Sequence, residues 1–255
     1  MQPTTIIFAV FGAVAAAKFQ KMWPEYTVVF AVGLAALGVF FLSSRQKRRL
    51  PILAVDFDEV CVGYLPAFVE FNNAVHGTRL TLDDFQSYLF HEVKECELAS
   101  AADATERVYE FHSSANFDNI RPLPGALEAL RELARHLELH VVTSRQTDIE
   151  AQTRACAAAF FPGCFAALHF GNHFGKGGAK ISKPQMSADI GAVALIDDSL
   201  SYAAQCAAAG LPVFLFGEYG WNRTAEPLSP VITRVSDWGA VLDELLRKPA
   251  AAGGA

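Results

Sequence analysis

Short apolar runs alternate with amphipathic segments along the chain from residue 51 onward. Continuous apolar runs are typical of buried parallel strands, whereas apolar residues three or four positions apart indicate helices that cover a sheet. We expect strands at 52–55, 139–143, 166–170, 193–196 and 213–216. Helices are expected at 126–136, 148–160, near 184–190, at 200–209 and at 236–246. Such an alternation predicts an α/β fold with a doubly wound parallel sheet.

A helical insertion follows the first predicted strand. Residues 64–116 have helical periodicity and little strand character, and Thr81 with acids up to Asp84 resembles a helix start. We therefore expect a small, separate helical cap at this point. The resulting organisation is an α/β core of 51–63 and 117–247, a cap of 64–116, and a disordered tail of 248–255.

Two long runs without a charged side chain precede this domain, at about 5–17 and 26–44. The second run is just long enough to cross a bilayer as a helix, and a buried core helix is the alternative. Basic residues at 45–49 follow it directly, and the positive-inside rule then places the globular domain on the cytoplasmic side. We expect residues 1–50 to anchor the chain in a membrane.

The first apolar run has two interpretations. It can form a second membrane span, which would give a double-pass anchor. It can also be a cleaved signal peptide, because the small residues at 15–17 resemble a cleavage site, although the segment lacks a basic start. The anchor is therefore single-pass or double-pass.

Composition supports this division of the chain. The sequence is 52% hydrophobic, yet residues 1–43 contain only three charged side chains, so the apolar excess belongs to the N-terminal part. A formal net charge of −6 argues against a nucleic-acid partner, because binding to a phosphate backbone requires clustered Lys and Arg. The five cysteines are scattered and show no CxxC spacing, which is typical of reduced side chains rather than a zinc site.

Polar side chains follow three of the predicted strands. In an open parallel sheet, ligands bind beyond the carboxyl ends of the strands. The candidate groups, in chain order, are Asp56 and Asp58, Thr143 and Ser144, Lys180 and Lys183, and Asp197 and Asp198. Each fragment alone is common in loops. Four fragments in this order, each at a strand end or in a loop before one, indicate a single site.

This arrangement resembles the four motifs of the haloacid-dehalogenase superfamily: DxDxV, a strand-end Thr, a Lys and a DD pair. The resemblance covers roughly residues 52–247. Within the superfamily the chain is similar to the 5'(3')-deoxyribonucleotidase branch. The features that carry this closer resemblance are Val60 in the DxDxV position, the pair Thr143 and Ser144, the strand end at 195–198, and the segment 219–223, which resembles the PWN segment of that branch.

The resemblance implies a phosphomonoester hydrolase that works through an aspartyl-phosphate. Asp56 would attack phosphorus, and Asp58 would protonate the leaving oxygen and then activate water. The Thr143 hydroxyl and a lysine would bind the phosphoryl group. The spacing to the following helix favours Lys183 for this role, with Lys180 as the alternative.

The same resemblance implies a Mg²⁺ cofactor. Its ligands would be the Asp56 carboxylate, the Asp58 backbone carbonyl and Asp197. Asp198 would orient the lysine, and Ser144 would contact the substrate beyond the phosphate. The substrate class is a small phosphorylated compound, with nucleotides as the first expectation and sugar phosphates as the second.

Three positions depart from the pattern of that branch. Glu59 replaces the Gly common in DxDGV, Gly220 replaces a Pro before Trp221, and Arg145 stands where nucleotidases often carry Pro. These departures make the substrate the least transferable part of the resemblance.

Two other classes of function fit part of the sequence. The domain could be a membrane-tethered scaffold that has the fold but no turnover, with Glu59 as a sign of a changed site. A DxD glycosyltransferase also carries a membrane anchor and a metal-binding DxD. That hypothesis leaves Thr143, Asp197 and Asp198 unexplained, and the basic flank orients the domain to the wrong side.

Overall fold

The computed structural model describes residues 50–246. The predicted membrane segments at 5–17 and 26–44, the basic flank at 45–49 and the predicted tail at 248–255 lie outside the described residues. Within residues 50–246, no helix is long and apolar enough to cross a membrane.

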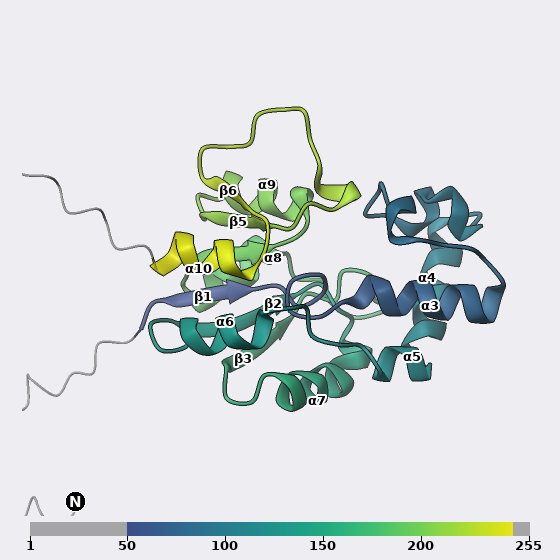
Figure 1. The fold of residues 1–255 in the computed structure, drawn as a ribbon, viewed down its shortest axis with the longest axis horizontal. Coiled ribbons are helices and arrows are strands. Elements are labelled where there is room, and N and C mark those ends of the chain that lie inside the picture. The colour runs from purple at the N-terminus through teal and green to yellow at the C-terminus, as the bar shows by residue number, and fades with distance from the viewer. Residues whose placement is uncertain (1–49, 247–255) are drawn as a thin grey trace, which may run out of the picture. The chain divides into compact units, whose positions relative to one another are not determined.

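The core of the described part is a sheet of six parallel strands in the order β3-β2-β1-β4-β5-β6 (Figure 1). The strands are β1 (Ile52–Val55), β2 (Glu138–Thr143), β3 (Phe165–Phe170), β4 (Ala192–Asp197), β5 (Val213–Phe216) and β6 (Ile232–Val235). The predicted doubly wound parallel sheet is confirmed. Because β1 pairs with both β2 and β4, the chain order reverses at β1, and this switch point is where open α/β sheets bind ligands.

The edge strand β6 was not predicted from the sequence. Its residues Ile232 and Val235 are buried, whereas Thr233 is exposed and Arg234 half-buried. The polar residues Thr233 and Arg234 interrupt the continuous apolar run by which the other five strands were recognised, and Arg234 is accommodated because its guanidinium donates hydrogen bonds to the carbonyls of Gly217 and Asn222.

Helices cover both faces of the sheet (Figure 1). They are α6 (Ala126–Leu133), α7 (Glu150–Phe160), α8 (Lys183–Ile190), α9 (Leu200–Ala208) and α10 (Trp238–Leu246). Leu53 and Val55 of β1 belong to the hydrophobic cluster that contains α6 and α10, while Ala54 belongs to the cluster of α8 and α9. Both faces of β1 are therefore buried, which explains its uninterrupted apolar sequence.

The segment between β1 and β2 begins with helices that form a cap beside the core (Figure 1). We use "cap" for residues 64–118, which contain α3 (Tyr64–His76), α4 (Ala101–His112) and α5 (Ala115–Asp118). Between α3 and α4 the chain makes only short 3₁₀ turns. The helix expected to start at Thr81 is one such turn, Leu82–Asp84, in which the Asp84 carboxylate accepts a hydrogen bond from the Thr81 backbone N–H at 2.7 Å.

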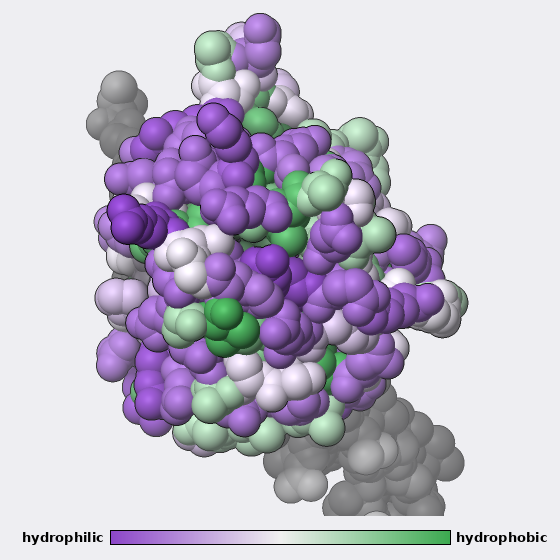
Figure 2. Space-filling view, turned by 90° about the vertical axis from the view of Figure 1, so that its right-hand side faces the viewer, coloured by the Kyte–Doolittle hydropathy of each residue, from purple (hydrophilic) through white to green (hydrophobic). Residues whose placement is uncertain are grey.

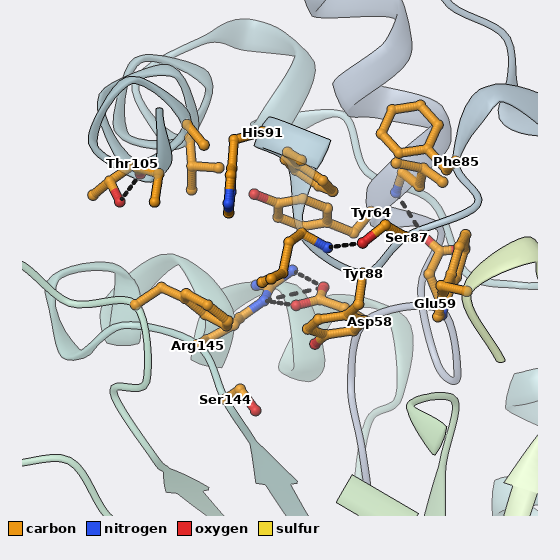
Figure 3. A pocket seen from close by; sticks show the side chains of 18 of the residues that line it. Asp58, Glu59, Tyr64, Phe85, Ser87, Tyr88, His91, Thr105, Ser144 and Arg145 are labelled. Carbon is orange, nitrogen blue, oxygen red and sulfur yellow. Dashed lines mark hydrogen bonds and ion pairs between the residues drawn. The ribbon is translucent and has the colours of Figure 1, made fainter. Parts of the chain in front are cut away.

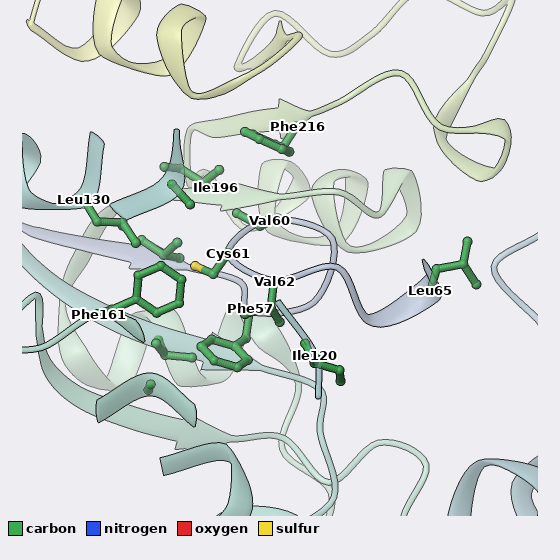
Figure 4. Packing of buried hydrophobic residues seen from close by; sticks show 14 of the residues in the cluster. Phe57, Val60, Cys61, Val62, Leu65, Ile120, Leu130, Phe161, Ile196 and Phe216 are labelled. Atoms are coloured by element: carbon green, nitrogen blue, oxygen red, sulfur yellow. The ribbon is translucent and has the colours of Figure 1, made fainter. Parts of the chain in front are cut away.

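The loop after β1 is fixed by core packing (Figure 4). Phe57, Val60, Cys61 and Val62 have no exposed surface. The Phe57 carbonyl accepts hydrogen bonds from the N–H groups of Cys61 at 2.9 Å and Val62 at 3.0 Å. The polar side chains of this loop therefore project from a tightly packed and hydrogen-bonded backbone.

The face of the described domain on the cap side is mostly hydrophilic, and its apolar side chains form small separate patches (Figure 2). Inside the cap, aromatic rings pack around Phe68. Its ring centroid lies 4.5 Å from that of Phe90, 5.5 Å from that of Phe111 and 6.4 Å from that of Phe85. These rings belong to, or pack against, the hydrophobic cluster that continues into the core.

We predict that Phe68→Ala lowers the free energy of unfolding by about 3–5 kcal/mol, because the truncation leaves a cavity among these rings. Urea denaturation followed by circular dichroism measures the change. Val75→Ala is the matched control on the same helix, because the Val75 side chain is 55% exposed, and we expect a change within about 0.5 kcal/mol. Equal effects of the two substitutions would contradict a packing role for Phe68.

Candidate active site

Asp56 follows the last residue of β1, at the carboxyl edge of the sheet. Its backbone N–H donates to the Ile196 carbonyl of β4 at 2.9 Å, so the position of the residue is set by the sheet itself. The side chain is buried, and its Oδ2 lies 2.9 Å from Nζ of Lys183. Burial raises the pKa of Asp56 to about 7, although the nearby Lys183 opposes the shift.

Lys183 is the first residue of α8 and is completely buried. Its Nζ lies 2.9 Å from Oδ2 of Asp56 and 2.5 Å from Oδ2 of Asp197. Burial alone would lower the pKa of Lys183, but the carboxylates of Asp197 and Asp56 outweigh that effect and raise it. Lys180, the alternative phosphate-binding lysine, is exposed. The structure therefore brings Lys183, and not Lys180, to the carboxylates.

Asp198 does not contact the lysine that we expected it to orient. Its Oδ2 accepts a hydrogen bond from Nε1 of Trp221 at 2.8 Å, and its carbonyl accepts one from Nδ2 of Asn222 at 2.9 Å. Asp197, and not Asp198, lies beside Lys183, because it is the last residue of β4 and its side chain faces Asp56. Burial and the neighbouring carboxylates raise the pKa of Asp198 well above its usual range.

Three carboxylates form a possible cation site. Asp56, Asp197 and Asp198 each contribute one oxygen, and these oxygens lie within 4.8 Å of one another in buried surroundings. Carboxylate oxygens are the ligands that Mg²⁺ prefers. Burial, together with the neighbouring carboxylates, raises the pKa of both Asp56 and Asp198, and a bound cation would favour their ionised forms. A divalent cation fits this donor set, which includes the predicted ligands Asp56 and Asp197 and adds Asp198.

Asp58 is paired with Arg145, a residue that the sequence singled out only as a departure (Figure 3). Nη2 of Arg145 lies 2.7 Å from Oδ1 of Asp58, and Nε lies 3.0 Å from Oδ2. The Arg145 side chain is 3% exposed and that of Asp58 is 26% exposed. No local sequence signal links the two, because they are 87 residues apart and meet only through the parallel pairing of β1 and β2.

Thr143 is the last residue of β2 and Ser144 follows it, beside the loop after β1. Thr143 is 1% exposed, and its Oγ1 accepts a hydrogen bond from the Arg145 backbone N–H at 3.2 Å. Ser144 is buried and contributes to the wall of the pocket described next. Both predicted substrate-binding hydroxyls thus lie at the same sheet edge as Asp56.

A pocket opens between Asp58 and the cap (Figure 3). Six aromatic side chains line it: Tyr64, Phe85, Tyr88, Phe90, Phe174 and Trp221. Polar groups, including Ser87, His91 and His112, lie between them. Burial lowers the pKa of His112 to about 4, so this residue presents a neutral imidazole at pH 7. The pocket can therefore accept a flat apolar group with a few hydrogen-bonding atoms.

Glu59 joins the loop after β1 to the cap. Its φ is +54°, a conformation that favours Gly and is strained for other residues. The Glu59 carboxylate accepts a hydrogen bond from the Leu65 N–H in the first turn of α3 at 2.5 Å, and the Glu59 carbonyl accepts one from the Tyr219 hydroxyl at 2.8 Å. Burial raises the pKa of the Glu59 side chain to about 8. These contacts offset the backbone strain and explain why Glu is accommodated here.

The structure also explains why Gly, and not Pro, stands at position 220. A Cβ atom at this position would overlap the carbonyl oxygen of Phe85 and the side chain of Gln86, both in the cap. The close approach of the cap therefore excludes the Pro that the sequence analysis expected before Trp221. On either side of Gly220, the Tyr219 and Trp221 rings stack in parallel with centroids 4.5 Å apart.

The sequence matches the family model described as "5' nucleotidase, deoxy (Pyrimidine), cytosolic type C protein" over residues 50–247. Among proteins with curated functions, none matches.

Several solved structures share the fold. A haloacid dehalogenase-like hydrolase from Streptococcus pneumoniae superposes with a TM-score of 0.58 at 12% identity, covering 76% of this chain and 98% of that one. A predicted phosphatase from Clostridium acetobutylicum gives 0.57 at 15% identity, covering 78% of this chain and 100% of that one. A HAD-hydrolase from Bacillus subtilis, solved bound to magnesium, gives 0.52 at 14% identity, covering 78% and 99%.

We predict that Lys183→Met lowers the free energy of unfolding by about 3–5 kcal/mol in the presence of a chelator, because it leaves buried carboxylates without a cation. Urea denaturation provides the measurement. Lys180→Met is the matched control, and we expect a change within about 0.5 kcal/mol because Lys180 is exposed. A larger loss for Lys180→Met would show that Lys183 is not the cation on which the site depends.

Proposed function

The chain belongs to the family of 5' nucleotidase, deoxy (Pyrimidine), cytosolic type C proteins and is a phosphatase of the haloacid-dehalogenase type; from this premise we propose that it hydrolyses phosphomonoesters with Mg²⁺ through an aspartyl-phosphate. The observation that carries the proposal is the convergence of Asp56, Asp197 and Asp198 around the single buried ammonium of Lys183. Burying several carboxylates together destabilises a fold, and binding of a cation and a phosphoryl group would explain why this chain buries them.

In the first step Asp56 acts as the nucleophile. One of its carboxylate oxygens forms a bond to phosphorus while the bond from phosphorus to the leaving oxygen breaks. Asp58 donates its proton to that oxygen, so the product leaves as an alcohol. Thr143 and the Lys183 ammonium bind phosphoryl oxygens and offset their charge.

In the second step Asp58 takes a proton from water as the water oxygen attacks phosphorus. The bond between Asp56 and phosphorus breaks, inorganic phosphate leaves, and Asp58 holds the proton needed for the next cycle. Mg²⁺ held by Asp56, Asp197, Asp198 and the Asp58 carbonyl would supply positive charge against the phosphoryl oxygens. Ser144 would contact the substrate beyond the phosphate.

The aromatic pocket favours a nucleotide as the substrate over a sugar phosphate. Nucleobases stack on aromatic side chains, and the pocket provides several such rings next to Asp58. The family description, which names a 5' nucleotidase, points to the same class of compound.

We further propose that residues 1–50 attach the enzyme to a membrane in one or two passes, with the catalytic domain on the cytoplasmic side. The uncharged run at 26–44 and the basic residues at 45–49 support this location.

We expect the full chain to hydrolyse p-nitrophenyl phosphate with Mg²⁺ and to lose this activity with a chelator. Asp56→Asn should lower kcat by about 10⁴-fold or more, because the amide is not a nucleophile. Asp118→Asn, an exposed carboxylate in α5, is the matched control and should retain full activity. If the chain has no turnover, and Mg²⁺ with beryllofluoride does not raise its melting temperature, the domain is a catalytically silent scaffold.

The nucleotide preference is tested with Phe174→Leu. The Phe174 side chain lines the pocket and is 42% exposed, so the substitution should have little effect on folding. Loss of one stacking ring is worth about 1–3 kcal/mol, which predicts a rise in KM of about 5- to 150-fold for a nucleoside monophosphate. Ribose 5-phosphate is the control substrate and should show an unchanged KM. Equal losses for both compounds would count against a nucleobase in this pocket.

A further inference from the structure

We propose that Arg145 is the positioning residue for the carboxylate of Asp58, so that the efficiency of proton transfer to the leaving group depends on a side chain that contacts neither phosphate nor metal. This inference rests on the acid–base role proposed above for Asp58. It assigns a function to the residue that stands in place of the expected Pro.

Asp58 depends on Arg145 for its orientation. Nη2 of Arg145 lies 2.7 Å from Oδ1 of Asp58, and Nε lies 3.0 Å from Oδ2, so the guanidinium engages both oxygens. Within residues 50–246, no other side chain donates a hydrogen bond to this carboxylate. A paired contact of this kind fixes the plane of the carboxylate as well as its position.

Arg145 is itself held by groups other than Asp58. Its Nη1 donates to Oγ1 of Thr153 at 2.9 Å, and the Thr153 hydroxyl donates to the Ile149 carbonyl at 2.8 Å. The guanidinium carbon lies 4.9 Å from the ring centroid of Phe57 and 5.1 Å from that of Phe117. The guanidinium is thus held between α7, the loop after β1 and the cap. Because its own position is fixed, it restricts the orientation of the Asp58 carboxylate.

The arrangement leaves Asp58 free to react. A carboxylate has about four lone-pair sites, and Arg145 occupies only those that face it. When Asp58 carries the proton, its remaining lone pairs still accept from Nε and Nη2. Arg145 cannot give up a proton at ordinary pH, so it orients the acid without replacing it. Proton transfer requires the acid to lie within hydrogen-bond reach of the leaving oxygen, so the rate of this transfer depends on the orientation of the Asp58 carboxylate.

The test is the dependence of kcat/KM on the leaving group in the full chain carrying Arg145→Gln, because kcat/KM reports on the steps up to departure of the leaving group, whereas kcat also contains the second step, which is the same for all substrates. Nitrophenolate is a stable anion and needs little help from an acid, whereas the alkoxide of a nucleoside 5'-monophosphate needs a proton. We expect kcat/KM to fall by about 10- to 100-fold for the nucleotide, within the range of acid–base catalysis, and by less than about threefold for p-nitrophenyl phosphate. A purely structural loss would lower both rates by the same factor.

Three further variants separate positioning from folding. Thr153→Val removes the hydrogen bond that holds Arg145 and leaves the ion pair intact, so it should shift the ratio of the two rates in the same direction but less. Arg145→Lys should recover part of the nucleotide rate, because one ammonium replaces only one of the two contacts. In an Asp58→Asn background, Arg145→Gln should have no further effect on kcat/KM, because the group that it positions is gone.

Equal losses in kcat/KM for both substrates, additive effects in the Asp58→Asn background, or a rise in kcat/KM of Arg145→Gln for the nucleotide would overturn the proposal. A rise would mean that the ion pair holds Asp58 away from the leaving group. If Arg145→Gln does not fold, the ratio measured with Thr153→Val decides, and an unchanged ratio rejects the role. Absence of turnover by the unaltered chain would instead reject the proposed function on which this role depends.

Discussion

The burial of one lysine ammonium among carboxylates is the constraint on which this site depends. Lys183 lies 2.9 Å from Asp56 and 2.5 Å from Asp197, and all three side chains are removed from water. Such charges are stable inside a protein only when they are paired. Asp56 follows β1, Asp197 ends β4 and Lys183 begins α8, so this requirement ties two central strands and a helix to one point. The strand order brings the charges together, and their pairing in turn fixes the strand ends.

Sequence reasoning could locate most of this arrangement, because it follows from local pattern and parallel topology. An apolar run identifies a buried strand, and the residue after it must lie at the carboxyl edge of the sheet. Asp56, Thr143 and Asp197 could be placed by that rule alone. The ion pair of Arg145 with Asp58 and the contact of Trp221 with Asp198 could not, since each depends on how side chains far apart in sequence orient after folding. The strand β6 could not be recognised, because the polar residues Thr233 and Arg234 interrupt its apolar run.

The three departures from the nucleotidase pattern share one location in the fold. Glu59 binds the first turn of α3, Gly220 allows the cap to approach at Phe85, and Arg145 contacts Phe117 of α5. Each lies where the cap meets the loops at the carboxyl edge of the sheet. None belongs to the cluster of Asp56, Lys183 and Asp197. The three positions therefore affect how the cap is held against the core, and they make no hydrogen bond or ion pair with Asp56, Lys183 or Asp197 in the described residues.

This separation has a chemical consequence. The phosphoryl group is common to all phosphomonoesters, so the residues that bind it have little freedom to vary. The leaving group differs between substrates, and in the proposed mechanism it would occupy the space between Asp58 and the cap, where the aromatic pocket lies. Asp58 stands at the border of the two regions, since its backbone belongs to the loop after β1 and its carboxylate pairs with Arg145, which contacts Phe117 of the cap. If the proposed roles hold, a change in the cap boundary would affect both the choice of leaving group and the orientation of the acid that protonates it.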